Sequence, residues 1–287
     1  MKRAFFGGVH PKGYKELSRE AAIVPLHPSV VSVAMSQHIG APCQPLVKVG
    51  DRVTVGQKIG DGQGLCVPVH ASVSGTVTAI EARPHPGGNL QTAIVIESDG
   101  RDTLCPTVKP RDPEAVAAMS AEDLIAVIRE AGITGMGGAG FPTHVKINCK
   151  AEFVLANGAE CEPLLRVDQQ VMQYFAADVV RGIRAVKEFT GAKRAVICLK
   201  EHYHAAVAAL QEVLKDADDV ELHLLQGYYP AGDEQQIVYE VTGRVVPTGG
   251  LPLDVGAVVC NVSTLTNIAA ALDARRSRRN MSRSAAR

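Results

Sequence analysis

The sequence predicts an α/β protein in two parts: a β-rich first third, and a longer part in which strands and helices alternate. Three observations carry this prediction. Short runs of alternating apolar and polar residues, separated by Gly and Pro, fill residues 45–97 and are typical of a compact sandwich or barrel. A proline-bounded stretch at 106–113 is typical of a linker. Beyond it, apolar runs alternate with helical periodicity, which predicts a mostly parallel sheet with helices on both faces.

The β-rich part contains three predicted strand regions. Residues 45–60 alternate apolar and polar side chains around a turn at Gly50, and residues 68–80 repeat the pattern around Gly75. Residues 92–97 form a third clear strand.

This part is similar to a biotinyl or lipoyl carrier fold, in which a lysine at a hairpin tip carries the cofactor. The corresponding stretch, residues 61–67, contains no lysine. A docking or scaffold role is therefore favoured over a swinging arm.

Helix signals in the second part come from caps and apolar stripes. Ser120 and Asp123 make a capping-box-like start for a helix over 121–131. Asp168 is expected to cap one long helix that ends at Gly191. The other predicted elements are strands at 153–156, 195–199 and 220–225 and helices at 202–215 and 234–241, the last capped by Asp233 and stopped by Gly243.

Composition excludes several classes of protein. The 287 residues balance 30 Lys and Arg against 30 Asp and Glu, so there is no basic excess of the kind nucleic-acid binders use. A hydrophobic content of 46% is that of a folded globular chain. No apolar run has the roughly 18–20 residues that cross a bilayer, and Gly7 and Gly8 interrupt the basic start before a signal sequence develops. A cytosolic-type protein is expected.

The 7 cysteines do not form a CxxC pair. Structural zinc and iron–sulfur clusters usually need closely spaced thiolates, so no self-contained metal site is expected. Buried free thiols are the expected state. The arginine-rich tail at 273–287 has no periodicity; a disordered end is favoured over a basic nucleic-acid arm.

A glycine-rich segment runs from Gly135 to Lys146. Gly135, Gly137 and Gly140 match GxGxxG, but a predicted helix precedes them and Phe141 follows directly, so an ordinary Rossmann turn is not expected. The glycines still let the backbone approach a flat or anionic ligand, and Lys146 adds a positive charge. A solvated surface loop is the alternative.

A second segment follows the strand at 153–156. Asn157, Glu160 and Glu162 stand at its carboxyl end, where α/β folds place ligands, and their polar groups suit ribose or ring N–H partners. A polar turn with solvated glutamates explains them as well.

A third segment spans residues 227–235. Asp233 has a role available as a helix cap, and Glu234 is favoured in a first helical turn by the helix dipole. Ligand binding is the competing explanation for both.

Together these segments resemble the RnfC family of the Rnf electron-transport complex, over about residues 6–272. The motifs that carry the resemblance are Gly7–Lys12, Gln37–Pro42, Val69–Val77, the Gly135 loop, Asn157–Pro163 and Gly249–Gly256. The resemblance implies a barrel-sandwich hybrid domain at 1–108 and an irregular basic tail at 273–287. Between them it implies an α/β FMN- and NADH-binding domain at 112–272, similar to the flavoprotein subunit of respiratory complex I.

The same resemblance implies a cofactor site. Phe141 is expected to stack on NADH, and Glu162 and Glu234 to bind its hydroxyl groups. Ala159 stands where the complex I subunit has an aspartate, which removes one flavin contact, and His144 is expected to be a bystander. The full expected set for FMN and NADH is Gly135, Gly137, Gly138, Gly140, Phe141, Lys146, Asn157, Glu160, Glu162, Gly232, Asp233, Glu234, Asn261 and Thr264.

The implied reaction is hydride transfer from NADH to FMN, followed by release of single electrons. The cofactors supply the chemistry and the protein positions them, so no catalytic side chain and no metal ligand are expected. The implied partners are NADH and the other subunits of an ion-translocating Rnf complex, with no nucleic acid. The implied location is cytoplasmic, peripheral on the inner face of the bacterial cell membrane.

In the family, a β-grasp domain and a ferredoxin-like domain with two 4Fe-4S clusters follow, and this sequence stops before them. One permitted back-translation of residues 274–286, read one base later, gives a β-rich stretch. A frameshift that truncated the protein is therefore a hypothesis. Two alternative functions stay open: a flavin-dependent cobalamin reductase, which tends to lack the leading barrel, and a non-catalytic docking or assembly module.

Overall fold

The computed structural model of the chain describes residues 8–18 and 22–273. These residues fall into two compact units. The β-rich unit contains residues 23–145 and 270–273, and the α/β unit contains residues 8–18, 22 and 146–269. The predicted domain division between 108 and 112 stays a prediction, and the tail at 274–287 lies outside the described residues.

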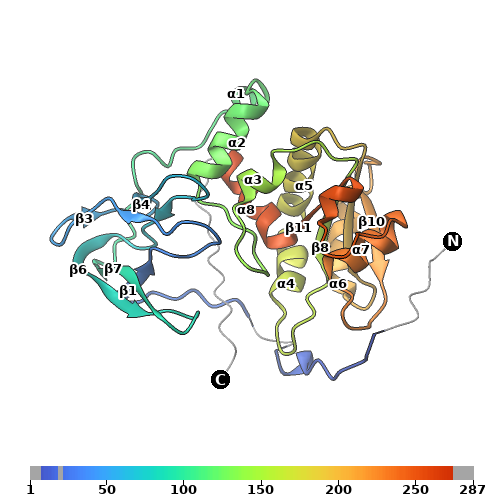
Figure 1. The fold of residues 1–287 in the computed structure, drawn as a ribbon, viewed down its shortest axis with the longest axis horizontal. Helices are drawn as coiled ribbons and strands as arrows, with labels where there is room; N and C mark the ends of the chain where they lie inside the picture. The colour runs from blue at the N-terminus through green and yellow to red at the C-terminus, as the bar shows by residue number, and fades with distance from the viewer. Residues whose placement is uncertain (1–7, 19–21, 274–287) are drawn as a thin grey trace. The chain divides into compact units, whose positions relative to one another are not determined.

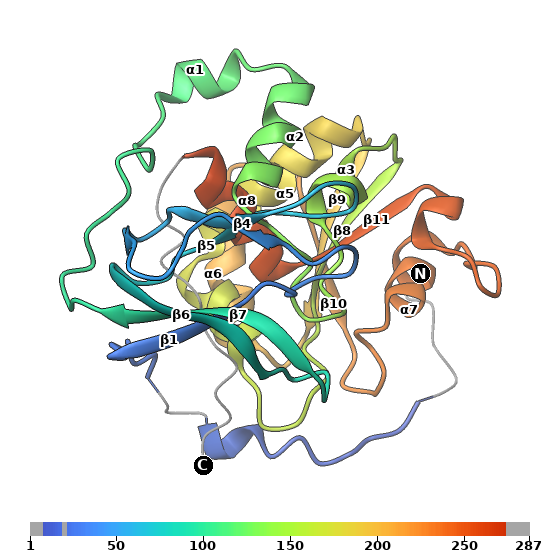
Figure 2. The same ribbon diagram turned by 60° about the vertical axis from the view of Figure 1, so that its left-hand side comes forward.

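Two antiparallel sheets make up most of the β-rich unit (Figure 2). One has the order β1-β7-β6-β3 and the other the order β2-β4-β5, and every neighbouring pair is antiparallel. This arrangement of short strands and two sheets confirms the predicted sandwich-like architecture. The strands are β1 Val30–Ala34, β2 Gln44–Pro45, β3 Arg52–Val53, β4 Lys58–Asp61, β5 Val69–His70, β6 Gly75–Pro84 and β7 Leu90–Ser98.

The core of the β-rich unit is formed by inward side chains of both sheets. Met35, Ile59, Ile94 and Ile96 are almost completely buried and belong to one cluster, which also contains the thiols of Cys43 and Cys66. Burying each large aliphatic side chain contributes about 1.5–3 kcal/mol relative to exposure. The two sheets are therefore held together by one shared apolar layer.

The segment at 111–145 contains helices, and its residues 129–132 contact the strands of the same unit. The helices are α1 Pro113–Ala117, α2 Ala121–Glu130 and most of α3 Thr143–Ile147. Arg129, in the last turn of α2, donates to Asp61 at 3.0 Å, and Lys58 pairs with Glu130. A Cβ on Gly132 would clash with the carbonyl oxygen of Pro68, so only glycine permits this approach.

A parallel four-stranded sheet forms the centre of the α/β unit (Figure 1). Its order is β10-β9-β8-β11, and each neighbouring pair is parallel, as the alternation of strands and helices predicts. The strands are β8 Phe153–Gly158, β9 Arg194–Lys200, β10 Glu221–Leu225 and β11 Ala257–Asn261; the helices are α4 Val167–Tyr174, α5 Ala176–Thr190, α6 His204–Leu214, α7 Glu234–Thr242 and α8 Val262–Leu272, and 3-10 turns occur at Lys15–Ser18 and Pro252–Val255.

Both faces of this sheet are covered. Phe153 and Leu155 pack in a cluster with Ile237 and Val238 of α7. Val154 points to the other face, because side chains alternate along a strand, and it is fully buried too. Helix α5 contacts β8 and β9, and Figure 1 shows α5 and α7 on different sides of β8. The expectation of helices on both faces is confirmed.

One predicted helix is two helices. The apolar stripe after Asp168 continues through Phe175, but at Phe175 the backbone leaves the helical region (φ −134°, ψ 31°) and separates α4 from α5. Asp168 also is not a cap: it lies in the first turn of α4. The cap position is occupied by Arg166, whose side chain does not cap the backbone of the helix and donates instead to Gln169 Oε1 at 3.4 Å. The periodicity of apolar residues alone does not reveal a break between two consecutive amphipathic helices.

Other helix ends confirm the sequence reading. Ser120 and Asp123 form the capping box, and Asp233 accepts hydrogen bonds from the backbone N–H groups of two following residues. Gly191 and Gly243 adopt the left-handed conformation that closes α5 and α7. Helix α6 begins at His204, two residues later than predicted.

Several elements had no sequence prediction, namely β1, α1, α3, β11 and α8. Among the described residues, no helix combines the length and the apolar character that crossing a membrane requires.

Candidate functional site

Two asparagines lie side by side at the carboxyl edge of the parallel sheet. Asn157 is the penultimate residue of β8, Asn261 is the last residue of β11, and the two are register partners. The Nδ2 of Asn157 donates to the carbonyl of Gly232 at 2.8 Å, and its Oδ1 accepts from Ala159 N at 3.1 Å. The amide of Asn157 therefore ties the turn after β8 to the turn before α7.

Asp168 holds the second asparagine. It is 7% exposed and accepts from Asn261 Nδ2 at 2.9 Å and from Ser263 Oγ at 3.2 Å. Asn261 Oδ1 in turn accepts from Ser263 N at 2.8 Å. Asp168 therefore fixes the orientation of Asn261, a role that its sequence position did not predict. Thr264, also in the expected set, is buried in the first turn of α8.

Glu160 points inward. It has a positive φ of 39° and is 6% exposed, and its carboxylate accepts from Asp168 N at 3.0 Å, which satisfies a free N–H group of the first turn of α4. Lys15 Nζ lies 3.5 Å from the same carboxylate and donates to the Glu160 carbonyl at 2.8 Å. These contacts show that Glu160 stabilises the turn after β8. Glu162, the other glutamate of this segment, is half-buried.

Gly232 sits where no side chain would fit. Its N–H donates to Cys161 Sγ at 3.0 Å, and an added Cβ would come within 2.9 Å of that sulfur. The turn before α7 and the turn after β8 thus pack directly against each other.

The remaining predicted residues of this unit lie next to Gly232. Asp233 caps α7, and Glu234 in the first turn forms an ion pair with Lys146 at 3.4 Å. Both charged groups of this pair are partly exposed. The α/β unit therefore brings together eight residues of the predicted set at one edge of its sheet, namely Lys146, Asn157, Glu160, Gly232, Asp233, Glu234, Asn261 and Thr264.

The glycine-rich loop belongs to the β-rich unit. Its base is closed by a hydrogen bond from Gly135 N to Phe141 O at 2.8 Å, and Ile39 N donates to Gly140 O at 3.2 Å. Gly137 and Gly140 have positive φ values of 80° and 73°. A Cβ on Gly138 would have no atom within 4 Å, so this backbone is open to a ligand. Phe141 is 37% exposed.

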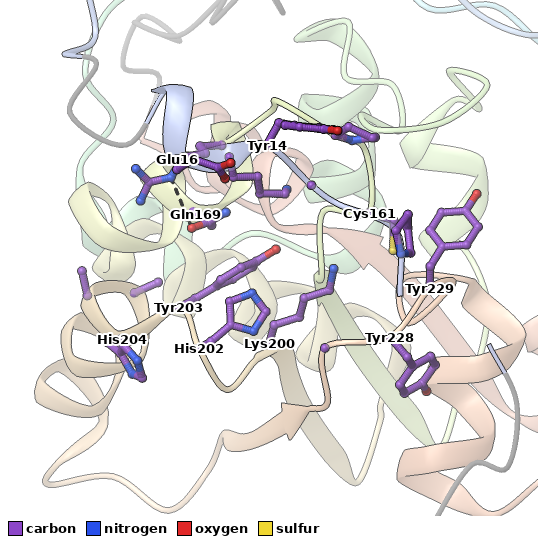
Figure 3. A pocket seen from close by; sticks show the side chains of 18 of the residues that line it. Tyr14, Glu16, Cys161, Gln169, Lys200, His202, Tyr203, His204, Tyr228 and Tyr229 are labelled. Carbon is purple, nitrogen blue, oxygen red and sulfur yellow. Dashed lines mark hydrogen bonds between the residues drawn. The ribbon is translucent and has the colours of Figure 1, made fainter. Parts of the chain in front are cut away.

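A cavity of about 660 Å³ opens at the carboxyl ends of β9 and β10 in the α/β unit. Figure 3 shows Lys200 projecting into it, with His202 and Tyr203 from the turn that follows. Lys200 is only 8% exposed, and within residues 8–18 and 22–273 its ammonium group has no hydrogen-bonding or ionic partner. An anion is the chemical complement of such a group.

Two neighbours of Lys200 have perturbed ionisation. Burial, followed by the charges of Lys200 and Lys15, lowers the pKa of His202, so its ring is neutral at pH 7. Burial and the nearby Glu160 carboxylate raise the pKa of Tyr203, whose hydroxyl donates to the Ala159 carbonyl at 2.9 Å. The cavity is thus lined by a neutral imidazole, a neutral phenol and a free ammonium group.

The sequence reading missed Lys15, Asp168 and Lys200. No local pattern marks the roles of the first two: Lys15 reaches Glu160 across 145 positions, and Asp168 reaches Asn261 across 93. Lys200, as the last residue of a buried strand, did carry a usable signal, because a charge at the carboxyl end of a parallel strand stands where α/β folds bind ligands.

Two domain models match successive parts of the chain. The RnfC barrel sandwich hybrid domain matches residues 3–101, and the Nuo51 FMN-binding domain matches residues 128–270. Two solved structures of an NAD+-reducing NiFe hydrogenase, in the H2-reduced and air-oxidised states, are 24% and 25% identical with TM-scores of 0.46 and 0.45. They cover 56% and 57% of this chain, which covers 33% of each of theirs.

The RnfC component of the Na(+)-translocating ferredoxin:NAD(+) oxidoreductase complex of Acetobacterium woodii is 43% identical over 274 residues. The match includes 92% of this chain, which spans 61% of the length of that relative. The relative and the two domain models, taken in chain order, lead to one conclusion: the chain belongs to the RnfC family.

Proposed function

We propose that the chain is the electron-input part of an Rnf-type complex, which binds FMN and oxidises NADH. Family membership and the FMN-binding domain support FMN as cofactor. The A. woodii relative is part of a ferredoxin:NAD(+) oxidoreductase complex, which supports NAD(H) as the partner of the flavin and further Rnf subunits as binding partners. Association with the inner face of the membrane is part of the same proposal.

The observation that carries the proposal is the pairing of Asn157 with Asn261 at the carboxyl edge of β8 and β11. Ligands of open α/β sheets bind at this edge. Within the described residues, each amide donates one N–H and accepts once at Oδ1, and these contacts fix its orientation. The second N–H and the second lone pair of Oδ1 are the groups that would meet a ligand. Such pre-oriented amides suit the alternating donors and acceptors of a flavin.

The available groups fit FMN. The glycine loop has open backbone at Gly138 and left-handed glycines at Gly137 and Gly140, which suits close approach of a planar ring. Lys146 supplies a cation for a phosphate. When bound, FMN supplies the hydride-accepting and single-electron chemistry.

The side chains of this chain have binding and positioning roles in the proposal. Asn157, Asn261 and Lys146 hold the cofactor, Glu160 keeps the turn after β8 in place, and Asp168 orients Asn261. Phe141 and the carboxylates of Glu162 and Glu234 bind the nicotinamide nucleotide, with Glu234 exchanging its ion pair with Lys146 for a hydroxyl contact. None of these residues needs to transfer a proton.

The presence of the barrel argues against the cobalamin reductase alternative, because such reductases tend to lack it. Residues 3–101 match the RnfC barrel domain, and the structure shows its two antiparallel sheets.

The test is flavin binding and reduction by the purified chain under anaerobic conditions. The chain is loaded with FMN, the dissociation constant is measured by flavin fluorescence, and NADH is added while the flavin absorbance is followed. We expect FMN to bind, NADH to bleach it, and Asn157→Ala and Asn261→Ala each to weaken FMN binding about tenfold or more.

The matched control is Asn89→Ala, an exposed asparagine in the turn before β7. It should leave FMN affinity unchanged. Equal affinity in the wild type, Asn157→Ala and Asn261→Ala would refute the assigned site. FMN that binds but is not reduced by NADH would refute the nucleotide part of the proposal.

A further inference from the structure

The β-rich unit contains a cluster of two thiols and an imidazole that no part of the proposed flavin chemistry uses. Cys43 Sγ lies 3.5 Å from Cys66 Sγ, and Cys66 Sγ lies 3.8 Å from His38 Nε2. All three ligand atoms are within 4.8 Å of one another. Cys43 and Cys66 are 3% and 0% exposed, and His38 is partly exposed.

The hydrogen bonds of His38 determine its tautomer. Its Nδ1 lies 3.1 Å from the carbonyl of Ile39, which can only accept, so Nδ1 carries the proton. Its Nε2 lies 3.3 Å from the N–H of Val67, which can only donate, so Nε2 presents a lone pair. Metal-binding histidines have the same tautomer, with a backbone carbonyl on one ring nitrogen and the lone pair of the other directed at the metal. In this structure that lone pair accepts from Val67 N–H, and a metal ion would take the place of this hydrogen bond.

The backbone holds the two thiol-bearing segments together. Ala41 N donates to Leu65 O at 3.0 Å, and Cys43 N donates to Met35 O at 2.9 Å. Gly40, with a φ of 119°, permits the first contact, because a Cβ there would clash with Leu65 O. The spacing of the sulfur atoms is thus set by the fold and not by flexible side chains alone.

We propose that His38 Nε2, Cys43 Sγ and Cys66 Sγ bind a zinc ion, with water as the fourth ligand on the side where His38 is exposed. Tetrahedral zinc, with Zn–S of about 2.3 Å and Zn–N of about 2.0–2.1 Å, places sulfurs about 3.7–3.8 Å apart and sulfur and nitrogen about 3.5–3.6 Å apart. The observed 3.5 Å and 3.8 Å lie within about 0.3 Å of those values.

The charge and the chemical softness of these three ligands also favour zinc. Two thiolates balance the charge of a divalent ion, so the loaded site is neutral, as a buried position requires. Thiolate and imidazole ligands select zinc over magnesium or calcium. On binding, the two S–H protons leave to solvent and two Zn–S bonds and one Zn–N bond form, with no change in oxidation state.

The site has a consequence for the glycine loop, and this consequence rests on the proposed function. A Cβ on Gly140 would lie 3.2 Å from Gln37 O and 3.3 Å from His38 Cα, and Ile39 N donates to Gly140 O. The loop therefore rests on the segment that carries the His38 ligand. A bound zinc ion would hold His38, and with it the segment on which the glycine loop packs, in a fixed position.

The direct test is metal content of the full chain, purified under reducing conditions and measured by inductively coupled plasma mass spectrometry. We expect about one zinc per chain in the wild type and in the control Cys105→Ser, which removes a buried thiol of the same unit outside the cluster. Cys43→Ser and Cys66→Ser should retain only background zinc. Equal zinc in all four proteins would overturn the proposal, since the metal would then be bound elsewhere.

Cobalt gives a second readout that does not require a cysteine variant to fold. Cobalt(II) added to the apo wild type should produce thiolate charge-transfer absorbance and tetrahedral ligand-field bands, which zinc abolishes. His38→Ala, at the partly exposed ligand, should bind cobalt at least about tenfold more weakly. Absence of the charge-transfer band, or a mass showing Cys43 and Cys66 joined as a disulfide in the metal-loaded chain, would disprove the site. Neither readout depends on FMN or NADH.

Discussion

Strands β8 and β6 show how differently the two units use their sheets. In β8 of the α/β unit, five of the six residues are buried, because helices cover both faces. In β6 of the β-rich unit, burial alternates at the start and the last four residues are exposed. Polar groups can therefore stand along the strands of the β-rich unit, whereas in the α/β unit they are displaced to the strand ends. The predicted flavin ligands of the α/β unit occupy those ends.

The two cores should respond separately to loss of a large side chain. Leu155 in β8 and Ile94 in β7 are both fully buried, each at the centre of its own unit. Leu155→Ala and Ile94→Ala should each lower the unfolding free energy by about 2–5 kcal/mol through lost burial and a cavity. Hydrogen exchange resolved by peptide should show lost protection mainly in the unit that carries the substitution. If either variant lost hydrogen-exchange protection equally in both units, the prediction that the two cores respond separately would be wrong.

A close helix crossing distinguishes the α/β unit further. Gly182 of α5 meets α8, and a Cβ there would clash with the backbone of Leu265. Gly182→Ala should destabilise the chain by about 3 kcal/mol, the upper end for overpacking, since backbone atoms cannot rotate away. Gly227→Ala, where the nearest atom to the new Cβ is 3.5 Å away, should change the stability by less than about 0.5 kcal/mol. Denaturant unfolding measures both, and similar values for the two variants would contradict the crossing.

Removing Asp168 probes the strand-end polar network directly. Asp168→Ala leaves the donors of Asn261 and Ser263 without this partner, and the expected loss of stability is about 1–3 kcal/mol. FMN affinity should also fall, because Asn261 loses its orientation. Asp178→Ala, in the first turn of α5, serves as a comparison for a lost acidic residue near a helix start. If the Asp168→Ala chain bound FMN with unchanged affinity, the orientation of Asn261 would not matter for FMN binding, and the prediction would be wrong.

The smallest expected effect concerns a surface pair of the α/β unit. Arg184 donates two hydrogen bonds to Asp219, each 2.7 Å long, and thereby holds the pKa of that carboxyl below its usual value. A lowered folded-state pKa stabilises the fold above the unfolded-state pKa, and this contribution disappears as pH falls through the folded value. Asp219→Asn should cost under about 1 kcal/mol at neutral pH, since both groups are exposed. The difference between variant and wild type should vanish in acid; a constant difference would point to a cause other than charge.

Local signals in the sequence predicted local structure well. The capping box of Ser120, the cap of Asp233 and the left-handed glycines at Gly191 and Gly243 all depend on neighbours within a few residues. The parallel sheet followed from the alternation of strands and helices. The break at Phe175 was missed because apolar side chains keep the same period on both sides of it.

Long-range contacts are what the sequence could not predict. Cys43 and Cys66 are 23 positions apart, so a search for closely spaced thiols does not pair them. A backbone hydrogen bond from Ala41 to Leu65 brings their segments together. Asp168 looked like a cap because of its position before an apolar stripe, whereas its partners come from the end of β11. The resemblance to a family supplied the strand-end residues Asn261 and Thr264, although the strand and helix that carry them had no prediction.

The N-terminal segment of the α/β unit has a practical consequence. Val9 pairs with Tyr229, and Lys15 donates to the carbonyls of Glu160 and Leu165, so this stretch fastens the turns after β8 and β10 from outside. An N-terminal truncation that removes the barrel in order to isolate the α/β unit would also remove these contacts. A shortened version that begins near residue 112 lacks these contacts, so residues 8–18 should be retained in it.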